Sequence, residues 1–261
     1  MLSKIIILYV MAVCTSCDSN ENYTNEKNLP VEIMAPQLNE NPFKFINEIP
    51  LPSGFSRLKY GDNSYAAWLE NLPLKRNKTV YLFNGRAKLN QQAQYAVLNI
   101  SVGKQDLQQC ADAVMRLRAE YLYERKNYSA IIFKDNNGTV YKFTPPYTRD
   151  NFDKYLNRVF AMCGSASLSK QLKPVPFQLI KAGDILIKGG FPGHAVMVMD
   201  IAENQQGERI YLLAQSYMPA QDIHVLINPL DKKLSPWYKV NDELTIQTPE
   251  YYFTQSDLKS F

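Results

Sequence analysis

Residues 184–218 read DILIKGGFPGHAVMVMDIAENQQGERIYLLAQSYM, and this stretch decides the fold. It contains three apolar runs, at 184–190, 194–202 and 209–218, with glycines between them. Short apolar runs bounded by turn residues are typical of strands. We therefore expect three strands here, followed by a fourth in DIHVLIN at 222–228.

The chain before this stretch mixes strands and helices. Leu107, Cys110, Val114, Leu117 and Tyr121 recur at helical spacing, which predicts a long amphipathic helix over 106–126. Shorter helices are expected at 64–71, at 151–164 and just after it. The runs 78–85 and 94–103 predict two antiparallel strands, and 129–143 predicts a hairpin. The order predicts an α+β fold with helices packed against one face of an antiparallel sheet.

Composition limits the class of partner. The 261 residues include 46% apolar and 21% charged side chains, which is ordinary for a globular protein. The net charge of +4 comes from 29 basic and 25 acidic residues without a basic run. Nucleic acid is therefore not expected as a partner.

The start of the chain predicts export. MLSKIIILYVMAVCTSC has a lysine near its start, an apolar core and small residues before Cys17, and it resembles a bacterial lipoprotein signal. We expect a signal peptide over 1–17, lipidation at Cys17, a polar tether over 18–45 and a single domain over 46–261. The protein would then be held at a membrane of the cell envelope by its lipid. An ordinary cleaved leader and an uncleaved anchor remain alternatives.

The mature domain keeps two cysteines, Cys110 and Cys163, which either pair or stay free. Cys110, His194 and Gln215 follow the order nucleophile, base and orienting residue that papain-like cysteine hydrolases use. The competing interpretations are a buried core cysteine and a core histidine. A helix that begins near Asp106 would place Cys110 a full turn inside it, away from the free N–H groups that activate such thiols.

The segment KAGDILIKGGFPGHAVMVMDIA with RIYLLAQS resembles the closing half of NlpC-type peptidoglycan endopeptidases. That resemblance implies a papain-like arrangement, with Cys110 as nucleophile, His194 as general base and Gln215 as its orienting partner. The chain departs from the family pattern, because Ala182 stands where that family has proline and Gln109 precedes the cysteine in place of aspartate.

Three further segments carry a closer resemblance. DLQQCADAVMRLRAEYLYE, GGFPGHAVMVMD and LLAQSYMPAQDIHVL, with SPWY after them, look together like a bacterial lipoprotein family known as domain of unknown function 4846. The resemblance spans about residue 47 to the end and implies no reaction.

The sequence also predicts a ligand-binding site made of aromatic and basic side chains. Tyr217 and Trp237 are predicted to line a groove for sugar rings or a peptide, and Arg116 and Arg118 to pair with carboxylates of the ligand. The alternative is that the aromatics cover the sheet edge and the arginines are solvated. His224 is expected to be structural or on the surface, and neither a metal nor a cofactor is expected. Two functions stay open: an envelope cysteine hydrolase that cuts amide bonds of peptidoglycan peptides, and a non-catalytic protein that binds a glycan, peptide or partner in the same cleft.

Overall fold

Strand β7 (His194–Asn204) is the centre of the fold, and nine of its eleven residues are buried. In the computed structural model, which describes residues 40–261, Ala195, Met197 and Met199 pack into one apolar cluster. Val196 and Val198 pack into a second. Because successive side chains of a strand point to opposite faces, these two sets show that both faces of the sheet are covered.

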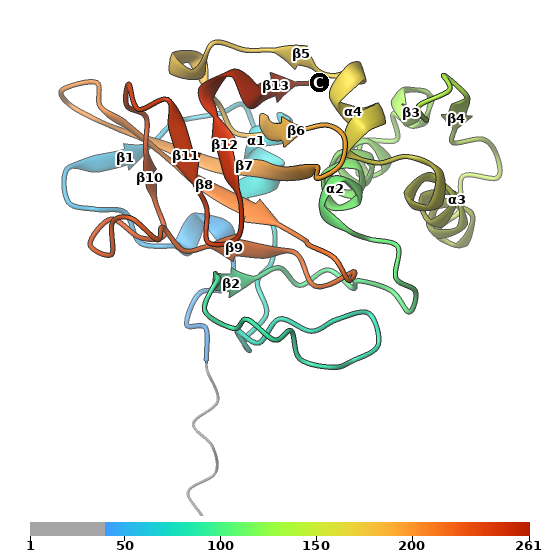
Figure 1. Cartoon of the computed structure of the whole chain (residues 1–261), viewed down its shortest axis with the longest axis horizontal. Helices are drawn as coiled ribbons and strands as arrows, with labels where there is room; N and C mark the ends of the chain where they lie inside the picture. The colour runs from blue at the N-terminus through green and yellow to red at the C-terminus, as the bar shows by residue number, and fades with distance from the viewer. Residues whose placement is uncertain (1–39) are drawn as a thin grey trace, which may run out of the picture. The chain divides into compact units, whose positions relative to one another are not determined.

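The strands around β7 form one nine-stranded sheet, and every pairing in it is antiparallel. Its main path runs β2-β9-β8-β7-β6-β13-β5, while β1 pairs with the end of β7 and β10 with β8 (Figure 1). The strands are β1 (Phe55–Arg57), β2 (Gln94–Val97), β5 (Lys173–Pro174), β6 (Ile185–Lys188), β8 (Arg209–Gln215), β9 (His224–Leu226), β10 (Tyr238–Lys239) and β13 (Leu258–Ser260).

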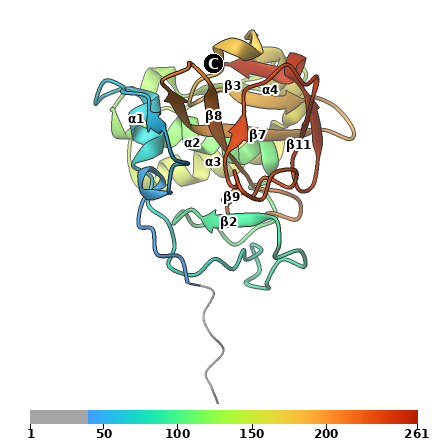
Figure 2. The same ribbon diagram turned by 90° about the vertical axis from the view of Figure 1, so that its left-hand side faces the viewer.

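Helices cover one face of this sheet and a hairpin covers the other. Leu117 of α2 and Phe152 of α3 belong to the same cluster as Met197, whereas Ile246 of β11 and Phe253 of β12 pack with Val196. Figure 2 shows β11 and α2 on opposite sides of the sheet. The remaining elements are α1 (Tyr65–Glu70), α2 (Cys110–Glu124), α3 (Arg149–Met162), α4 (Ser165–Gln171), the hairpins β3 (Ile132–Lys134) with β4 (Val140–Lys142) and β11 (Thr245–Gln247) with β12 (Tyr252–Thr254), and 3-10 turns at Ile46–Glu48, Tyr128–Ala130, Phe177–Leu179 and Gln255–Asp257.

The predicted α+β fold with a papain-like arrangement is wrong, although α2 and α3 do pack on one face of the sheet. The structure is rich in sheet and has few helices. The sheet is larger than predicted because it also includes the short strands β5, β10 and β13. Two or three residues are too few to show an alternating pattern. These strands are held by their partners in the sheet: β10 pairs with β8, β13 with β6, and β5 with β13.

The predicted pair of strands at 78–85 and 94–103 is also wrong. Only Gln94–Val97 forms a strand, and its partner is β9, more than a hundred residues away in the sequence. Residues near Leu82 make isolated bridges, one of them to Gln221. The predicted helix at 64–71, the 129–143 hairpin and the four strands from 184 to 228 are confirmed.

The predictions for residues 1–39, including the signal peptide, the lipidated Cys17 and most of the tether, lie outside the described residues. Within residues 40–261, no helix combines the length and apolar character that crossing a membrane requires.

Candidate functional site

His194 and Gln215 meet where two neighbouring strands end. His194 is the first residue of β7, Gln215 is the last of β8, and Nε2 of the imidazole lies 2.8 Å from Oε1 of the amide. Gly193 makes the approach to this position possible, since a Cβ there would collide with Oγ of Ser165 and the carbonyl of Gly190. The structure therefore brings together the two residues that the sequence predicted to pair.

The amide of Gln215 can adopt only one orientation. Its Nε2 donates to Oε2 of Glu250 at 2.8 Å and faces Nε2 of His224 at 3.4 Å. Nδ1 of His224 lies 2.9 Å from the carbonyl oxygen of Asp222, so this nitrogen carries the proton and Nε2 of His224 is an acceptor. Both amide hydrogens are thus used, and Oε1 must accept from His194.

This orientation assigns the tautomer of His194. Because Oε1 of Gln215 accepts a hydrogen bond, Nε2 of His194 carries the proton. Nδ1 is then left with a free lone pair, which is the form a general base needs. Burial lowers the pKa of His194 to about 4, so the ring is neutral at physiological pH.

Glu250 is itself held by an ion pair. Its Oε2 lies 2.6 Å from Nζ of Lys88, and its Oε1 accepts from Nδ2 of Asn90 at 3.0 Å. Burial disfavours the charged carboxylate, but the hydrogen bond and charge of Lys88 outweigh it and lower the pKa of Glu250. An ionised carboxylate accepts from all of these donors at once, so Glu250 fixes Gln215 and, through it, His194.

Cys110 is the first residue of α2, which corrects the prediction that the helix begins near Asp106. Oδ1 of Asp106 accepts from the backbone N–H of Ala220 at 2.6 Å, which ties this residue to the loop after β8. Oδ2 of Asp112 accepts from the N–H of Gln109 at 3.0 Å and caps the helix one residue before the cysteine. Cys110 therefore sits at a helix N-terminus, where activated thiols are found.

Three backbone N–H groups act on the thiol of Cys110. The N–H groups of Ala195, Ala111 and Cys110 itself lower the thiol pKa, but burial and the charge of Asp112 outweigh them and raise it to about 11. Ala195 directly follows His194, so this contact joins the start of α2 to the start of β7. Among residues 40–261, no hydrogen bond runs from the thiol to the imidazole. At neutral pH the pair consists of a neutral thiol and a neutral ring.

A pocket of about 490 Å³ opens over Cys110. Tyr217 and Tyr251 line it, and their rings flank His194 with centroid distances of 4.6 and 4.9 Å. Cys163 also borders the pocket, and the structure has it and Cys110 as free thiols, so no disulfide joins them. Cys110 therefore lines a pocket together with the two tyrosines whose rings flank His194.

The residues predicted to bind a ligand do not lie in one pocket. Tyr217 lines the Cys110 pocket, while Arg116 lines a neighbouring one. Arg118 lines neither of these two pockets, and its guanidinium lies over the rings of Tyr65 and Phe261. Trp237 is 1% exposed and its indole N–H donates to a backbone carbonyl, so its ring belongs to the core and the prediction of a ligand contact is corrected.

Sequence reasoning missed three residues of the site, Glu250, Tyr251 and Lys88. Glu250 and Tyr251 lie next to each other in a turn near the end of the chain, and Lys88 lies 162 residues before Glu250 in an irregular segment. No periodicity or motif connects these positions. Within residues 40–261, no group of three or more His, Cys, Asp or Glu side chains is placed to hold a metal ion.

One protein family matches most of the described residues. The family described as Domain of unknown function (4846) matches the chain in two stretches, residues 46–145 and 139–260, which contain Cys110, His194, Gln215 and Glu250. No curated protein and no solved structure matches the chain. Because the matched residues make up well over half of the sequence, the chain belongs to the family Domain of unknown function (4846).

Proposed function

We propose that the protein is a cysteine hydrolase that cleaves an amide bond, with Cys110 as nucleophile, His194 as base and Gln215 as the residue that orients His194. One observation carries the proposal. The Gln215 amide, held by Glu250, leaves Nδ1 of His194 unprotonated, and the backbone N–H of Ala195, the residue after His194, donates to the thiol of Cys110 at the start of α2. An oriented imidazole base next to such a thiol is the arrangement that nucleophilic catalysis needs.

The reaction follows from these positions. Sγ of Cys110 bonds to the carbonyl carbon while its proton passes to Nδ1 of His194. Backbone N–H groups at the start of α2 stabilise the negative oxygen that forms. The C–N bond then breaks, the imidazolium returns the proton to the leaving amine, and water hydrolyses the thioester with His194 again as base. Since both groups start neutral, the proton transfer accompanies the attack.

The cellular setting is part of the proposal. The leader that ends at Cys17 supports a lipid-anchored protein of the bacterial cell envelope. The resemblance of the 181–216 region to NlpC-type enzymes supports peptide amide bonds of peptidoglycan as the substrate. The aromatic lining of the pocket supports a substrate with flat or ring-shaped groups.

A second function is favoured by a different observation. Burial raises the pKa of the Cys110 thiol to about 11, and the thiol makes no hydrogen bond to His194 among the described residues. A thiol that stays protonated would leave a pocket that binds a glycan, peptide or partner protein without cutting it.

Alkylation of the folded full chain separates the two functions. Iodoacetamide at pH 8, followed by peptide mapping, measures the labelling rates of Cys110 and Cys163 in one sample. Hydrolysis predicts that Cys110 reacts faster than Cys163 and that His194→Ala slows it by at least about tenfold. Peptidoglycan fragments should also be cut by the wild type and left intact by Cys110→Ser. If Cys110 reacts no faster than Cys163, the binding function stands instead.

A further inference from the structure

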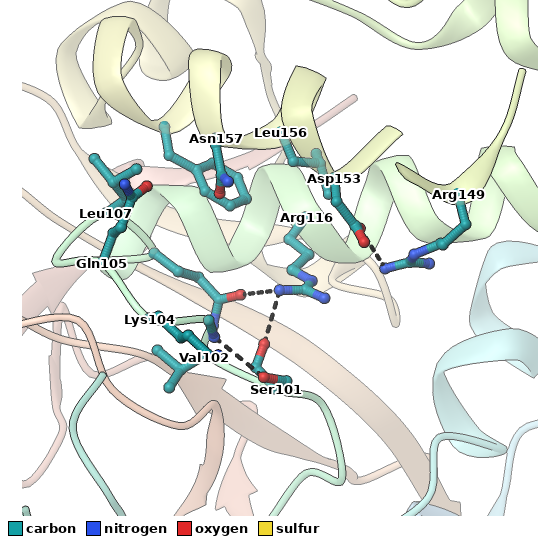
Figure 3. A pocket seen from close by; sticks show the side chains of 13 residues that line it. Ser101, Val102, Lys104, Gln105, Leu107, Arg116, Arg149, Asp153, Leu156 and Asn157 are labelled. Carbon is teal, nitrogen blue, oxygen red and sulfur yellow. Dashed lines mark hydrogen bonds and ion pairs between the residues drawn. The ribbon is translucent and has the colours of Figure 1, made fainter. Parts of the chain in front are cut away.

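A second pocket, of about 500 Å³, lies beside the Cys110 pocket between α2, α3 and the loop at 101–108. Figure 3 shows Arg116 reaching from α2 toward the backbone of Ser101, with Arg149 and Asp153 on α3 nearby. Three basic side chains line this pocket, Lys104, Arg116 and Arg149, against one acidic side chain, Asp153. The lining therefore favours a negatively charged ligand.

Arg116 is fixed in place with one donor group unused. Its Nη1 donates to the carbonyl of Ser101 and to Oε1 of Gln108, both at 2.8 Å, and its Nε donates to Glu120 at 3.3 Å. Nη2 has no hydrogen-bond partner within residues 40–261. The side chain is only 13% exposed, so a ligand meets a guanidinium that has already lost its freedom to move.

The charge of Arg116 is only partly balanced. Its acidic neighbour Glu120 also forms a bidentate ion pair with Arg149, whose Nη1 and Nη2 donate to the two carboxylate oxygens at 2.6 and 2.7 Å. Arg149 also pairs with Asp153 at 2.9 Å. Arg116 and Arg149 thus share Glu120 and Asp153, and Lys104, which has no ion pair within residues 40–261, leaves one positive charge in the pocket for a ligand.

Gln108 provides the second unmet donor. The side chain is 1% exposed and lines the pocket, and its Oε1 is occupied by Arg116. Its buried Nε2 has no acceptor among the described residues. A buried amide nitrogen without a partner marks a place where an acceptor is missing.

The two pockets are neighbours. Leu107 and Phe160 line both of them, and Gln108 is separated from Cys110 by one residue. Oγ of Ser216, next to Gln215, donates to the carbonyl of Gln108 at 3.0 Å. An extended ligand can therefore lie across both spaces.

We infer that the Arg116 pocket binds a carboxylate of the same substrate whose amide bond is cut at Cys110, so that the enzyme selects acidic peptides. A carboxylate fits better than a phosphate dianion, because one positive charge is unbalanced and Asp153 repels additional negative charge. This selection rests on the proposed function, since it assigns the Cys110 pocket to the amide bond.

Binding to the full chain carrying Cys110→Ala tests the inference without catalysis. The probes are acetyl-Ala-Glu-Ala-amide and acetyl-Ala-Gln-Ala-amide, which differ by one carboxylate, with titration calorimetry as the measurement. The acidic peptide should bind about tenfold more tightly, as expected for one charge-assisted contact at a partly open site. Arg116→Gln should abolish the difference, whereas the matched control Arg118→Gln, on the same helix but outside the pocket, should keep it.

A gain of affinity guards against misfolded variants. Asp153→Asn removes the acidic group that pairs with Arg149, and this substitution should tighten binding of the acidic peptide by roughly threefold. Equal affinity for the two peptides overturns the inference, and so does inorganic phosphate that competes as well as the acidic peptide. Failure of Cys110 to react with iodoacetamide would instead contradict the proposed hydrolase, while the difference in affinity between the two peptides would be unaffected, because it is measured in Cys110→Ala.

Discussion

Glu250→Gln should destabilise the protein strongly and loosen the candidate site at the same time. The carboxylate lies 2.6 Å from Nζ of Lys88, and the two side chains are 15% and 8% exposed. The substitution keeps the shape of the side chain but removes its charge. Lys88 is then left as a buried ammonium without a counterion, which typically costs about 3–5 kcal/mol.

Deprotonation of Lys88 sets a ceiling on that cost. From its ordinary pKa of 10.5, neutralising a lysine costs about 1.36 kcal/mol for each pH unit, which is about 4.8 kcal/mol at pH 7 and about 2 kcal/mol at pH 9. In the variant, burial lowers the folded-state pKa of Lys88 far below its unfolded value. Between those values the unfolded chain binds more protons, so the stability of the variant rises with pH.

Urea unfolding at pH 7 and pH 9 measures the effect. The expected loss in the free energy of unfolding is about 3–4 kcal/mol at pH 7 and about 2 kcal/mol at pH 9. Glu243→Gln, an exposed glutamate near the same end of the chain, is the matched control and should change stability by less than about 0.5 kcal/mol. Adding Lys88→Met to Glu250→Gln should restore more than half of the loss.

The same variant tests the orientation of His194. Lys88 and Nε2 of Gln215 donate to the same oxygen of Glu250, and in Glu250→Gln a neutral amide oxygen takes its place, so the hydrogen bond that holds the Gln215 amide weakens. Alkylation of Cys110 should then slow by about tenfold. A loss below about 1 kcal/mol at pH 7, or one that does not depend on pH, would refute the argument that this ion pair is buried and holds the site.

Three further predictions concern other parts of the chain. Burial lowers the pKa of His194 to about 4 and of His224 to about 3, so between pH 6.5 and 4.5 the unfolded chain takes up protons that the folded chain does not, and the wild type should lose about 3 kcal/mol or more of stability. Thermal unfolding at pH 7 and 4.5 measures this loss, and an unchanged midpoint contradicts it. Burial raises the pKa of Glu70 to about 8, so the folded wild type holds a proton that the unfolded chain releases between pH 4.5 and 8, and its stability falls as the pH rises through this window. Glu70→Gln should therefore stabilise by about 1 kcal/mol at pH 8 and by less at pH 5, measured by urea unfolding, after allowance for partial exposure of the group. Cys17→Ser should abolish palmitate incorporation and release the protein from membranes, whereas Cys14→Ser should still incorporate palmitate and stay bound to membranes. Equal palmitate labelling of the wild type and both variants would count against the lipid anchor.

The strands of the 184–228 region could be predicted because their apolar runs are long and bounded by turns. Cys110 shows the limit of the same reasoning. Leu107 continues the apolar spacing of the helix backward, yet the helix begins at Cys110 because Asp106 is bound to Ala220, 114 residues later. Contacts of this kind are invisible in a local pattern, and they decide whether the thiol lies inside a helix or at its end.

The sequence by itself determined the four strands from 184 to 228, the presence of the long helix, and the candidacy of His194 with Gln215, because local apolar patterns and residue chemistry suffice for these. Only the tertiary structure decided the size of the sheet, the burial of Trp237, and the place of Lys88 and Glu250 behind Gln215. Those features depend on contacts between residues far apart in the chain. Such contacts arise from burial and hydrogen-bond completion across the whole fold, and no short stretch of sequence encodes them.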